Sequence, residues 1–249
     1  MNSVQLAPTS ANPGVTLAWW LYHEAVRREE LKVDEFCGSY VLSYPRSGNH
    51  ATRFVLEFLS GQPTLGQMTT NHSSARRDYT ICRFSSGPNM FRSRLRCPPV
   101  AIKRHRLRPN DSVGKLVLIE RDPVEAVLSH TNRADQASEK DLEAGVAWWK
   151  SLQDSFENHP TGQRHLVRFE DIVDKGTGWI RDLTEFLDIQ TDGDAINRCA
   201  ELLDEANKTL RRKPLTNAPD TYREKFPKKA AFIERLANAQ GLTRLPESR

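Results

Sequence analysis

The chain has 249 residues, of which 38% are hydrophobic and 27% charged, and its formal net charge is +4. This composition is typical of a globular protein and excludes a chain that is mostly disordered. We expect a single domain over residues 1–249, because no long Pro/Gly/Ser linker divides the sequence. The longest wholly apolar run, Leu17–Tyr22, is far shorter than the ~20 residues of a membrane span, so we expect no membrane partner.

The first hundred residues predict one buried strand and two helices. Residues 1–14 are expected to be loose, and Thr16 is a candidate N-cap for a helix that ends near Lys32. The apolar run Ser39–Ser43 predicts a buried strand, and His50–Ser60 predicts a helix because its apolar residues recur at helical spacing. Residues 61–99 are irregular, polar and basic, which predicts a long surface loop.

Strands and helices alternate in the rest of the chain. The predicted strands are Val100–Lys103, Leu116–Glu120 and His165–Phe169. The predicted helices run from Pro123 to about Asn132, over Glu139–Asn158, and near 177–188, 193–206 and 228–239. Residues 207–226, which are basic and contain prolines, are expected to form a long loop. Such alternation indicates an α/β fold with a central parallel sheet flanked by helices.

Positive charge is concentrated between Arg76 and Lys115, where eleven Lys or Arg residues are opposed by two Asp. This segment therefore carries about +9 and the rest of the chain about −5. The concentration indicates an anionic ligand or partner, and a solvated basic loop is the alternative. No zinc finger, helix-turn-helix or aromatic-interleaved basic strand accompanies the charge, so we expect no nucleic-acid partner.

The four cysteines, Cys37, Cys82, Cys97 and Cys199, include no C-x-x-C pair. This spacing argues against a zinc site or a redox motif, so we interpret the cysteines as reduced thiols and expect no metal. The N-terminus has neither the basic start nor the continuous apolar stretch of a signal peptide. We therefore expect a cytoplasmic protein.

The stretch Tyr44–His50 joins the first predicted strand to the helix that follows it. Free N–H groups and the positive end of the helix dipole favour an anion at such a position. Gly48 lets the backbone approach a ligand closely, Ser47 supplies a hydroxyl, and Arg46 supplies a forked cation. The Walker pattern and G-x-G-x-x-G are absent, so the motif predicts a phosphate loop of another kind. A plain turn capped by Ser47 or Asn49 is the alternative.

A second motif lies at the carboxyl end of the strand that leads to Pro123, where open α/β sheets bind ligands. Arg121 would stand at the tip of this strand. Ser129 lies two turns into the following helix, so that both side chains can reach one phosphate. The alternative is that Arg121 pairs with Asp122 or Glu125 while Ser129 faces solvent.

A third motif ends another predicted strand. Lys103 and His105 alternate with Arg104, so their side chains point to the same side of the strand. A cation and an imidazole on one side are suited to acid–base chemistry beside a transferring anion. A purely structural histidine is the alternative, and the other six histidines have no comparable context in the sequence.

Together these motifs resemble the PAPS-dependent sulfotransferase family. That family has a Y-P-[KR]-S-G loop after its first strand, a strand-end K-x-H, and then an R-x-P-x-x-x-x-x-S-like element. The matching residues are Tyr44–Gly48, then Lys103 and His105, then Arg121, Pro123 and Ser129, with Val167–Asp171 similar to the family's Y-E-D. The resemblance covers about residues 39–189 and implies a P-loop-type, sulfotransferase-like nucleotide-binding fold.

The resemblance also implies roles for these residues. Arg46, Ser47, Gly48, Asn49 and His50 would hold the 5′-phosphosulfate of PAPS, and Arg121 and Ser129 its 3′-phosphate. His105 would be the general base, with Lys103 and Arg46 stabilising charge on the transferring group and the leaving phosphate.

Some positions depart from the family pattern. Arg46 stands where the family often has Lys, and Ala51 where it often has an adenine-flanking Trp. Phe169 replaces a tyrosine and is expected to stack in the donor site. Arg211, Arg212 and Lys213 are the nearest equivalent of the R-K-G element that grips the 3′-phosphate.

The sequence thus predicts a sulfotransferase that moves the sulfuryl group from PAPS to a hydroxyl or amine of a small molecule, leaving PAP. Residues 61–99 and the N-terminal helix with Trp19, Trp20 and His23 are candidate walls of the acceptor site. The alternatives are a small-molecule kinase with a related phosphate loop and a non-catalytic protein that binds a nucleotide or a polyanion. A homodimer is compatible with the sequence, which does not specify the acceptor.

Overall fold

The computed structural model describes residues 38–60, 64–66, 100–107, 111–131, 134–174, 176–210 and 221–242. The expectations for 1–14, for the helix from Thr16 with Trp19, Trp20 and His23, for most of 61–99 and for Arg211–Lys213 lie outside the described residues.

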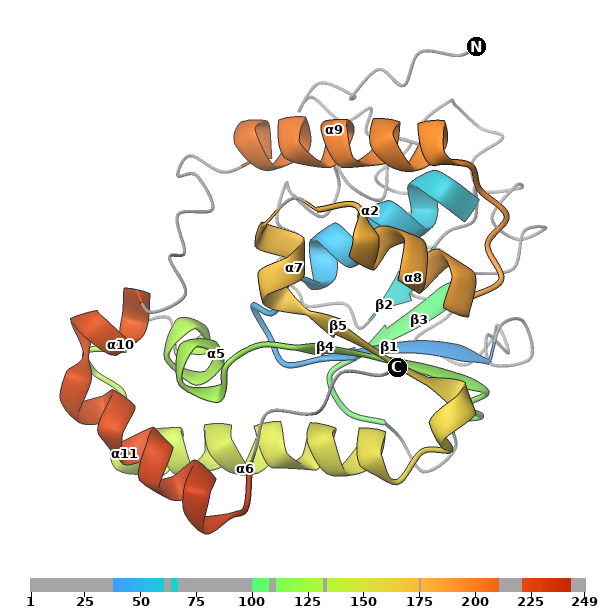
Figure 1. Cartoon of the computed structure of the whole chain (residues 1–249). Coiled ribbons are helices and arrows are strands. Elements are labelled where there is room, and N and C mark those ends of the chain that lie inside the picture. The colour runs from blue at the N-terminus through green and yellow to red at the C-terminus, as the bar shows by residue number, and fades with distance from the viewer. Residues whose placement is uncertain are drawn as a thin grey trace, which may run out of the picture.

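A parallel sheet forms the centre of the molecule, with the strand order β2-β3-β1-β4-β5 (Figure 1). The strands are β1 (Ser39–Ser43), β2 (Thr64–Gly66), β3 (Ala101–Arg104), β4 (Lys115–Glu120) and β5 (Arg164–Arg168). The chain leaves β1 for β2 and β3 on one side and continues to β4 and β5 on the other. A reversal of this kind is the position at which open α/β sheets bind ligands.

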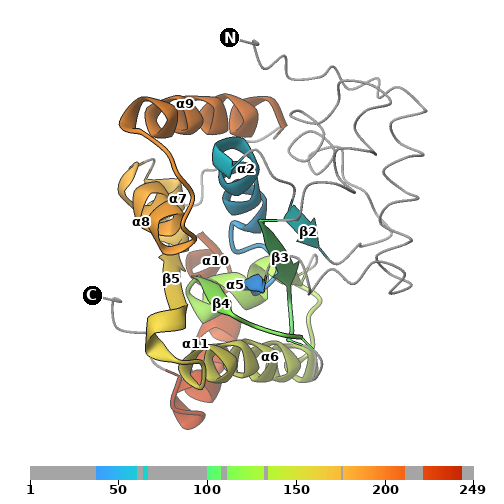
Figure 2. The ribbon, with the colours of Figure 1, turned by 90° about the vertical axis from the view of Figure 1, so that its right-hand side faces the viewer.

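Helices cover both faces of this sheet (Figures 1 and 2). One face carries α2 (Asn49–Ser60), α7 (Phe169–Val173), α8 (Gly178–Phe186) and α9 (Gly193–Leu210). The other face carries α5 (Pro123–His130), α6 (Glu139–Glu157), α10 (Thr221–Lys225) and α11 (Pro227–Ala239). In the described residues no helix is both long and apolar enough to cross a membrane.

The strand side chains divide between two apolar cores. Tyr40 and Leu42 of β1 pack with α5, α6 and α11, whereas Val41 packs with α2, α8 and α9. In β4, Leu118 and Ile119 divide between the two cores in the same way. A parallel sheet that is buried on both faces needs strands made of continuous apolar residues. This explains why continuous apolar runs, and not an alternation of apolar and polar residues, predicted these strands in the sequence.

Two helices begin with signals that the sequence carries. Pro123 is the first residue of α5, and the Asp122 side chain caps this helix by accepting from the Glu125 N–H at 3.0 Å. Ser138 and Asp141 form a reciprocal capping box at the start of α6. These caps define the first turns of α5 and α6, which lie on the same face of the sheet.

Among the described residues most predicted elements are confirmed, and three expectations are wrong. Residues 61–99 are not irregular throughout, because Thr64–Gly66 forms the edge strand β2. The strand expected to end at Phe169 ends at Arg168, and Phe169 opens the short helix α7. Residues 207–226 are not one loop, because α9 extends to Leu210 and Thr221–Lys225 is helical.

A buried polar cluster explains why β2 forms without an apolar pattern. Thr64 donates its backbone N–H to Glu57 Oε1 at 3.0 Å and accepts from Arg53 Nε at 2.8 Å. Burial lowers the pKa of Arg53, and the charge of Glu57 opposes this shift. Two side chains of α2 thus attach β2 to the sheet edge through hydrogen bonds, which a search for apolar periodicity does not detect.

Candidate functional site

The loop between β1 and α2 has two residues in the left-handed backbone region. Arg46 has φ = 69° and Gly48 has φ = 87°. A Cβ at Gly48 would lie 2.9 Å from Ile172 Cδ1 and 3.3 Å from Phe169 Cδ2, so the loop packs directly on α7. Alternation of backbone conformation of this kind turns successive N–H groups toward one concave point, which favours an anion.

The residues after Gly48 complete this concave loop. Helix α2 begins at Asn49, and the first N–H groups of a helix have no partner within the helix. Ser47 is fully buried, and its Oγ is one of the buried side-chain atoms for which the described residues offer no hydrogen-bond partner. A phosphate or sulfate oxygen would supply that partner, so the predicted phosphate loop Arg46–His50 fits an anionic group.

His105 follows β3 and lies beside this loop. Its Nδ1 is 2.7 Å from the carbonyl oxygen of Ser43. A carbonyl can only accept, so Nδ1 carries the hydrogen and the neutral ring keeps its lone pair on Nε2. Nε2 in turn contacts the ammonium of Lys103, which is 4% exposed. The prediction that Lys103 and His105 point to the same side is confirmed, and the tautomer is the one that a base at Nε2 requires.

Arg121 lies on the other side of the loop, at the end of β4. Its Nη1 donates to the carbonyl oxygen of Arg46 at 2.8 Å, and its Cζ lies 4.4 Å from the centre of the Phe169 ring. The side chain is 3% exposed, and burial lowers the pKa of Arg121 while the charge of Glu125 opposes the shift. Arginine stays charged under such a shift, so a cation is fixed against the Arg46–His50 loop.

The sequence left open whether Arg121 forms an ion pair with its neighbours Asp122 or Glu125. Nη2 of Arg121 does lie 3.6 Å from Glu125 Oε2, but the same guanidinium also reaches the loop. Ser129 is 8% exposed, so the alternative in which it faces solvent is wrong. Phe169 supports both the loop and Arg121, because Gly48 packs on its ring edge and Arg121 on its face.

Glu125 connects Arg121 to the C-terminal part of the chain. Its Oε1 accepts the backbone N–H groups of Tyr222 and Arg223, both at 2.9 Å, at the start of α10. Burial raises the pKa of Glu125, and these two hydrogen bonds oppose the shift. The sequence gives no indication of this role, because Glu125 and Tyr222 are 97 residues apart.

Three further side chains near the loop were not identified from the sequence. His130 lies 5.6 Å, between ring centres, from both Tyr44 and Trp148, so one of the histidines set aside in the sequence belongs to this region. Burial and the charge of Arg46 lower the pKa of His130. Trp148 and Trp149 contact the main chain at the ends of β3 and β4. Their only signal in the sequence is that they are adjacent on one amphipathic helix.

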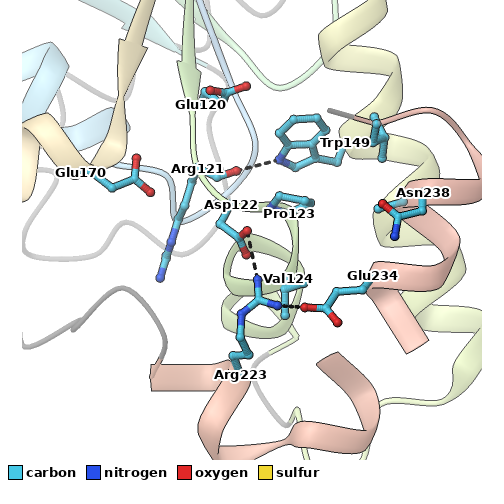
Figure 3. A pocket seen from close by; sticks show the side chains of 12 residues that line it. Glu120, Arg121, Asp122, Pro123, Val124, Trp149, Glu170, Arg223, Glu234 and Asn238 are labelled. Atoms are coloured by element: carbon cyan, nitrogen blue, oxygen red, sulfur yellow. Dashed lines mark hydrogen bonds and ion pairs between the residues drawn. The ribbon is translucent and has the colours of Figure 1, made fainter. Parts of the chain in front are cut away.

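A cavity of about 360 Å³ lies between β4, α5, α6 and α11 (Figure 3). Among its lining residues are Glu120, Asp122, Glu170 and Glu234, together with Trp149 and Arg223. Arg223 pairs with Asp122 at 3.2 Å and also with Glu234, whereas the side chain of Arg121 points away from Glu234 and Asn238 (Figure 3). The cavity therefore adjoins the predicted donor site but presents carboxylates, which do not suit phosphate groups.

The basic segment between Arg76 and Lys115 is described only at its C-terminal end. There, Arg104 pairs with Asp111 at 3.1 Å and Lys115 with Asp188 at 2.5 Å. These two cations have acidic partners within the chain. Lys103 contacts the imidazole of His105.

Comparison with known proteins agrees with this arrangement. Residues 113–193, which contain β4, α5 and β5, match the model of the sulfotransferase family. No curated protein matches the sequence.

Solved structures match over most of the chain. Mouse sulfotransferase SULT7A1 in complex with PAP is 15% identical, with a TM-score of 0.54 and coverage of 84% of this chain and 86% of that one. Retinol dehydratase, in complex with androsterone and the inactive cofactor PAP, is 17% identical, with a TM-score of 0.56 and coverage of 84% and 82%. The resemblance that the three motifs indicate is therefore confirmed: this chain is similar to the sulfotransferases in sequence over residues 113–193 and in fold over most of its length.

Proposed function

We propose that this protein transfers a sulfuryl group from PAPS to a hydroxyl or amine of a small-molecule acceptor. The observation that carries the proposal is the convergence of three strand ends on one anion-binding loop. His105 donates to the carbonyl of Ser43 before the loop, and Arg121 donates to the carbonyl of Arg46 within it. An anion pocket, a base and a buried cation are the parts that transfer of a charged group requires.

The proposed donor site divides into two parts. The loop Arg46–His50 would hold the 5′-phosphosulfate through its N–H groups and the Ser47 hydroxyl, whose lack of a partner in the described residues supports this role. Arg121 and Ser129 would hold the 3′-phosphate, with Phe169 carrying Arg121 on its ring. Arg211, Arg212 and Lys213 would add positive charge to the same phosphate.

When bound, PAPS supplies the sulfuryl group: a bond from the acceptor oxygen or nitrogen to sulfur forms, the bond from sulfur to the bridging oxygen breaks, and PAP leaves with the electron pair. His105 Nε2 takes the proton from the hydroxyl or amine of the acceptor molecule, because Nδ1 already donates its hydrogen to the Ser43 carbonyl. Lys103 and Arg46 supply positive charge for the sulfuryl and phosphate oxygens. The chain's own contribution is thus orientation, charge stabilisation and one proton transfer.

Calorimetric titration with PAP tests the donor part of this proposal. We expect micromolar binding of PAP and weaker binding of ATP and ADP. ATP binding without PAP binding would favour the kinase alternative. Binding of neither nucleotide would refute the proposal.

Two loop variants separate this site from general anion binding. Arg46→Asn removes an exposed guanidinium and keeps a residue that tolerates a left-handed backbone, so the fold should persist while PAP affinity falls about tenfold or more. Ser47→Ala should also weaken PAP binding. A protein that merely binds polyanions would instead show strong salt dependence and no response to Ser47→Ala. Transfer itself is measured as release of PAP from PAPS with phenol, ethanol or aniline as acceptor.

A further inference from the structure

The two proposed functional side chains next to the loop are held in the same way. His105 and Arg121 each donate from the side chain to a carbonyl oxygen of residues 43–46, at 2.7 and 2.8 Å. Each also accepts a hydrogen bond from an indole at its own main-chain carbonyl. Trp148 Nε1 lies 2.8 Å from His105 O. Trp149 Nε1 lies 3.1 Å from Arg121 O, and Figure 3 shows this second bond. Two adjacent tryptophans of α6 therefore hold the main chain of two residues whose side chains hold the loop.

Trp148 has further contacts with the base. Its ring lies edge-on to the His105 imidazole, with 5.9 Å between the ring centres. The hydrogen bond at the carbonyl and the ring contact together restrict both the backbone and the side chain of His105. They therefore favour the rotamer in which Nδ1 reaches Ser43 and Nε2 points toward Lys103.

Trp149 makes the corresponding contact on the donor side. Its ring is 5% exposed and lines the 360 Å³ cavity behind β4 (Figure 3). The hydrogen bond fixes the residue at which β4 ends and the chain turns into α5. Loss of this bond would leave the Arg121 carbonyl without its indole donor and free the residue to shift.

Helix α6 is built to keep both indoles in place. The capping box at Ser138 and Asp141 fixes its start. Leu142, Val146 and Leu152 are buried in the same core as the side chains of β1 and β4. Side chains of adjacent helical residues diverge by about 100°, which lets neighbouring indoles reach the ends of two different strands. Strand β1 lies between β3 and β4, so the two contacts enclose the strand that leads into the loop.

We propose that Trp148 and Trp149 are separate positioning residues, Trp148 for the base His105 and Trp149 for the donor-binding cation Arg121. This assignment rests on the proposed function, since it takes His105 and Arg121 in those roles. Trp149 is buried in the core, whereas Trp148 is partly buried against it. A role in core packing alone would therefore lower stability to different extents, without dividing the effects between PAP binding and the His105 tautomer. Separate positioning roles predict that each affects one half of the site.

The matched variants Trp148→Phe and Trp149→Phe test the proposal, because each removes one indole N–H and keeps an aromatic ring. PAP affinity is measured by calorimetry, and the tautomer of His105 by NMR with ¹⁵N-labelled histidine. Where a variant does not fold, benzothienylalanine at the same position keeps the ring size without the N–H.

We expect Trp149→Phe to weaken PAP binding about tenfold and to leave His105 in the Nδ1–H tautomer. We expect Trp148→Phe to leave PAP affinity within about twofold and to shift His105 toward the Nε2–H tautomer. Equal effects of the two variants on both measurements, or the reverse assignment, would overturn the proposal.

The failure of the proposed function is distinguishable from this outcome. Wild-type protein that does not bind PAP would refute the donor assignment. The NMR measurement then tests the Trp148 half alone: a tautomer shift in Trp148→Phe but not in Trp149→Phe supports the positioning of His105 by Trp148, and any other pattern overturns it.

Discussion

The substitution Gly48→Ala tests the geometry of the proposed phosphate loop most directly. Gly48 has φ = 87°, and an alanine there would adopt a left-handed backbone at a cost of about 1–2 kcal/mol. Its Cβ would lie 2.9 Å from Ile172 Cδ1, and overpacking of this kind costs about 1–3 kcal/mol. We therefore expect the free energy of unfolding to fall by about 2–5 kcal/mol, out of the roughly 5–15 kcal/mol of a typical domain.

Urea-induced unfolding, followed by tryptophan fluorescence, measures this change. PAP affinity, measured by calorimetry on the folded variant, should fall as well, because the displaced loop no longer directs its N–H groups to one point. Gly178→Ala is the matched control: this glycine begins α8, and a Cβ there would meet nothing within 4 Å. The control should be unchanged or slightly more stable, since alanine favours a helix over glycine.

A Gly48→Ala protein within about 0.5 kcal/mol of the wild type would refute this reasoning, because that is the range of substitutions that meet no obstacle. The loop would then not pack on α7 through a left-handed glycine. The anion-binding geometry that the proposed function depends on would be wrong as well.

Three further predictions concern the base, the pH dependence and the scaffold. His105→Ala should lower kcat for PAP release by at least ~10²-fold with PAP affinity within about twofold, and normal turnover would contradict the role of base. Burial lowers the pKa of His130 and of His165 from 6.5, so both protonate more readily in the unfolded chain, and the free energy of unfolding should fall as the pH drops below 6.5. In urea unfolding between about pH 5 and 7, the free energy of unfolding should depend less steeply on pH when both residues are Gln. An unchanged slope would count against this cause. Ser138→Ala should lower the free energy of unfolding by about 1 kcal/mol, because it removes the capping box of α6, and no change would mean that the box contributes nothing measurable.

The sequence alone determined the elements whose pattern is local. The apolar runs of β1 and β4, Pro123 at the start of α5 and the amphipathic pattern of α6 each depend on neighbouring residues, so they can be read along the chain. The motif Tyr44–His50 was found for the same reason: its residues lie on one strand-to-helix turn. The alternation of Lys103 and His105 likewise predicted that they face the same side.

The tertiary structure decided the contacts between distant segments. Arg121 and the Arg46 carbonyl are 75 residues apart, and Trp148 and the His105 carbonyl 43. A main-chain carbonyl accepts a hydrogen bond whatever its side chain, so neither partner leaves a recognisable pattern in the sequence. Edge strand β2 was missed for a related reason, because the side chains of Arg53 and Glu57 attach it through hydrogen bonds rather than through apolar burial. The sequence thus identified the chemical groups of the candidate site, and long-range hydrogen bonds that depend on the folded chain decided how these groups are held together.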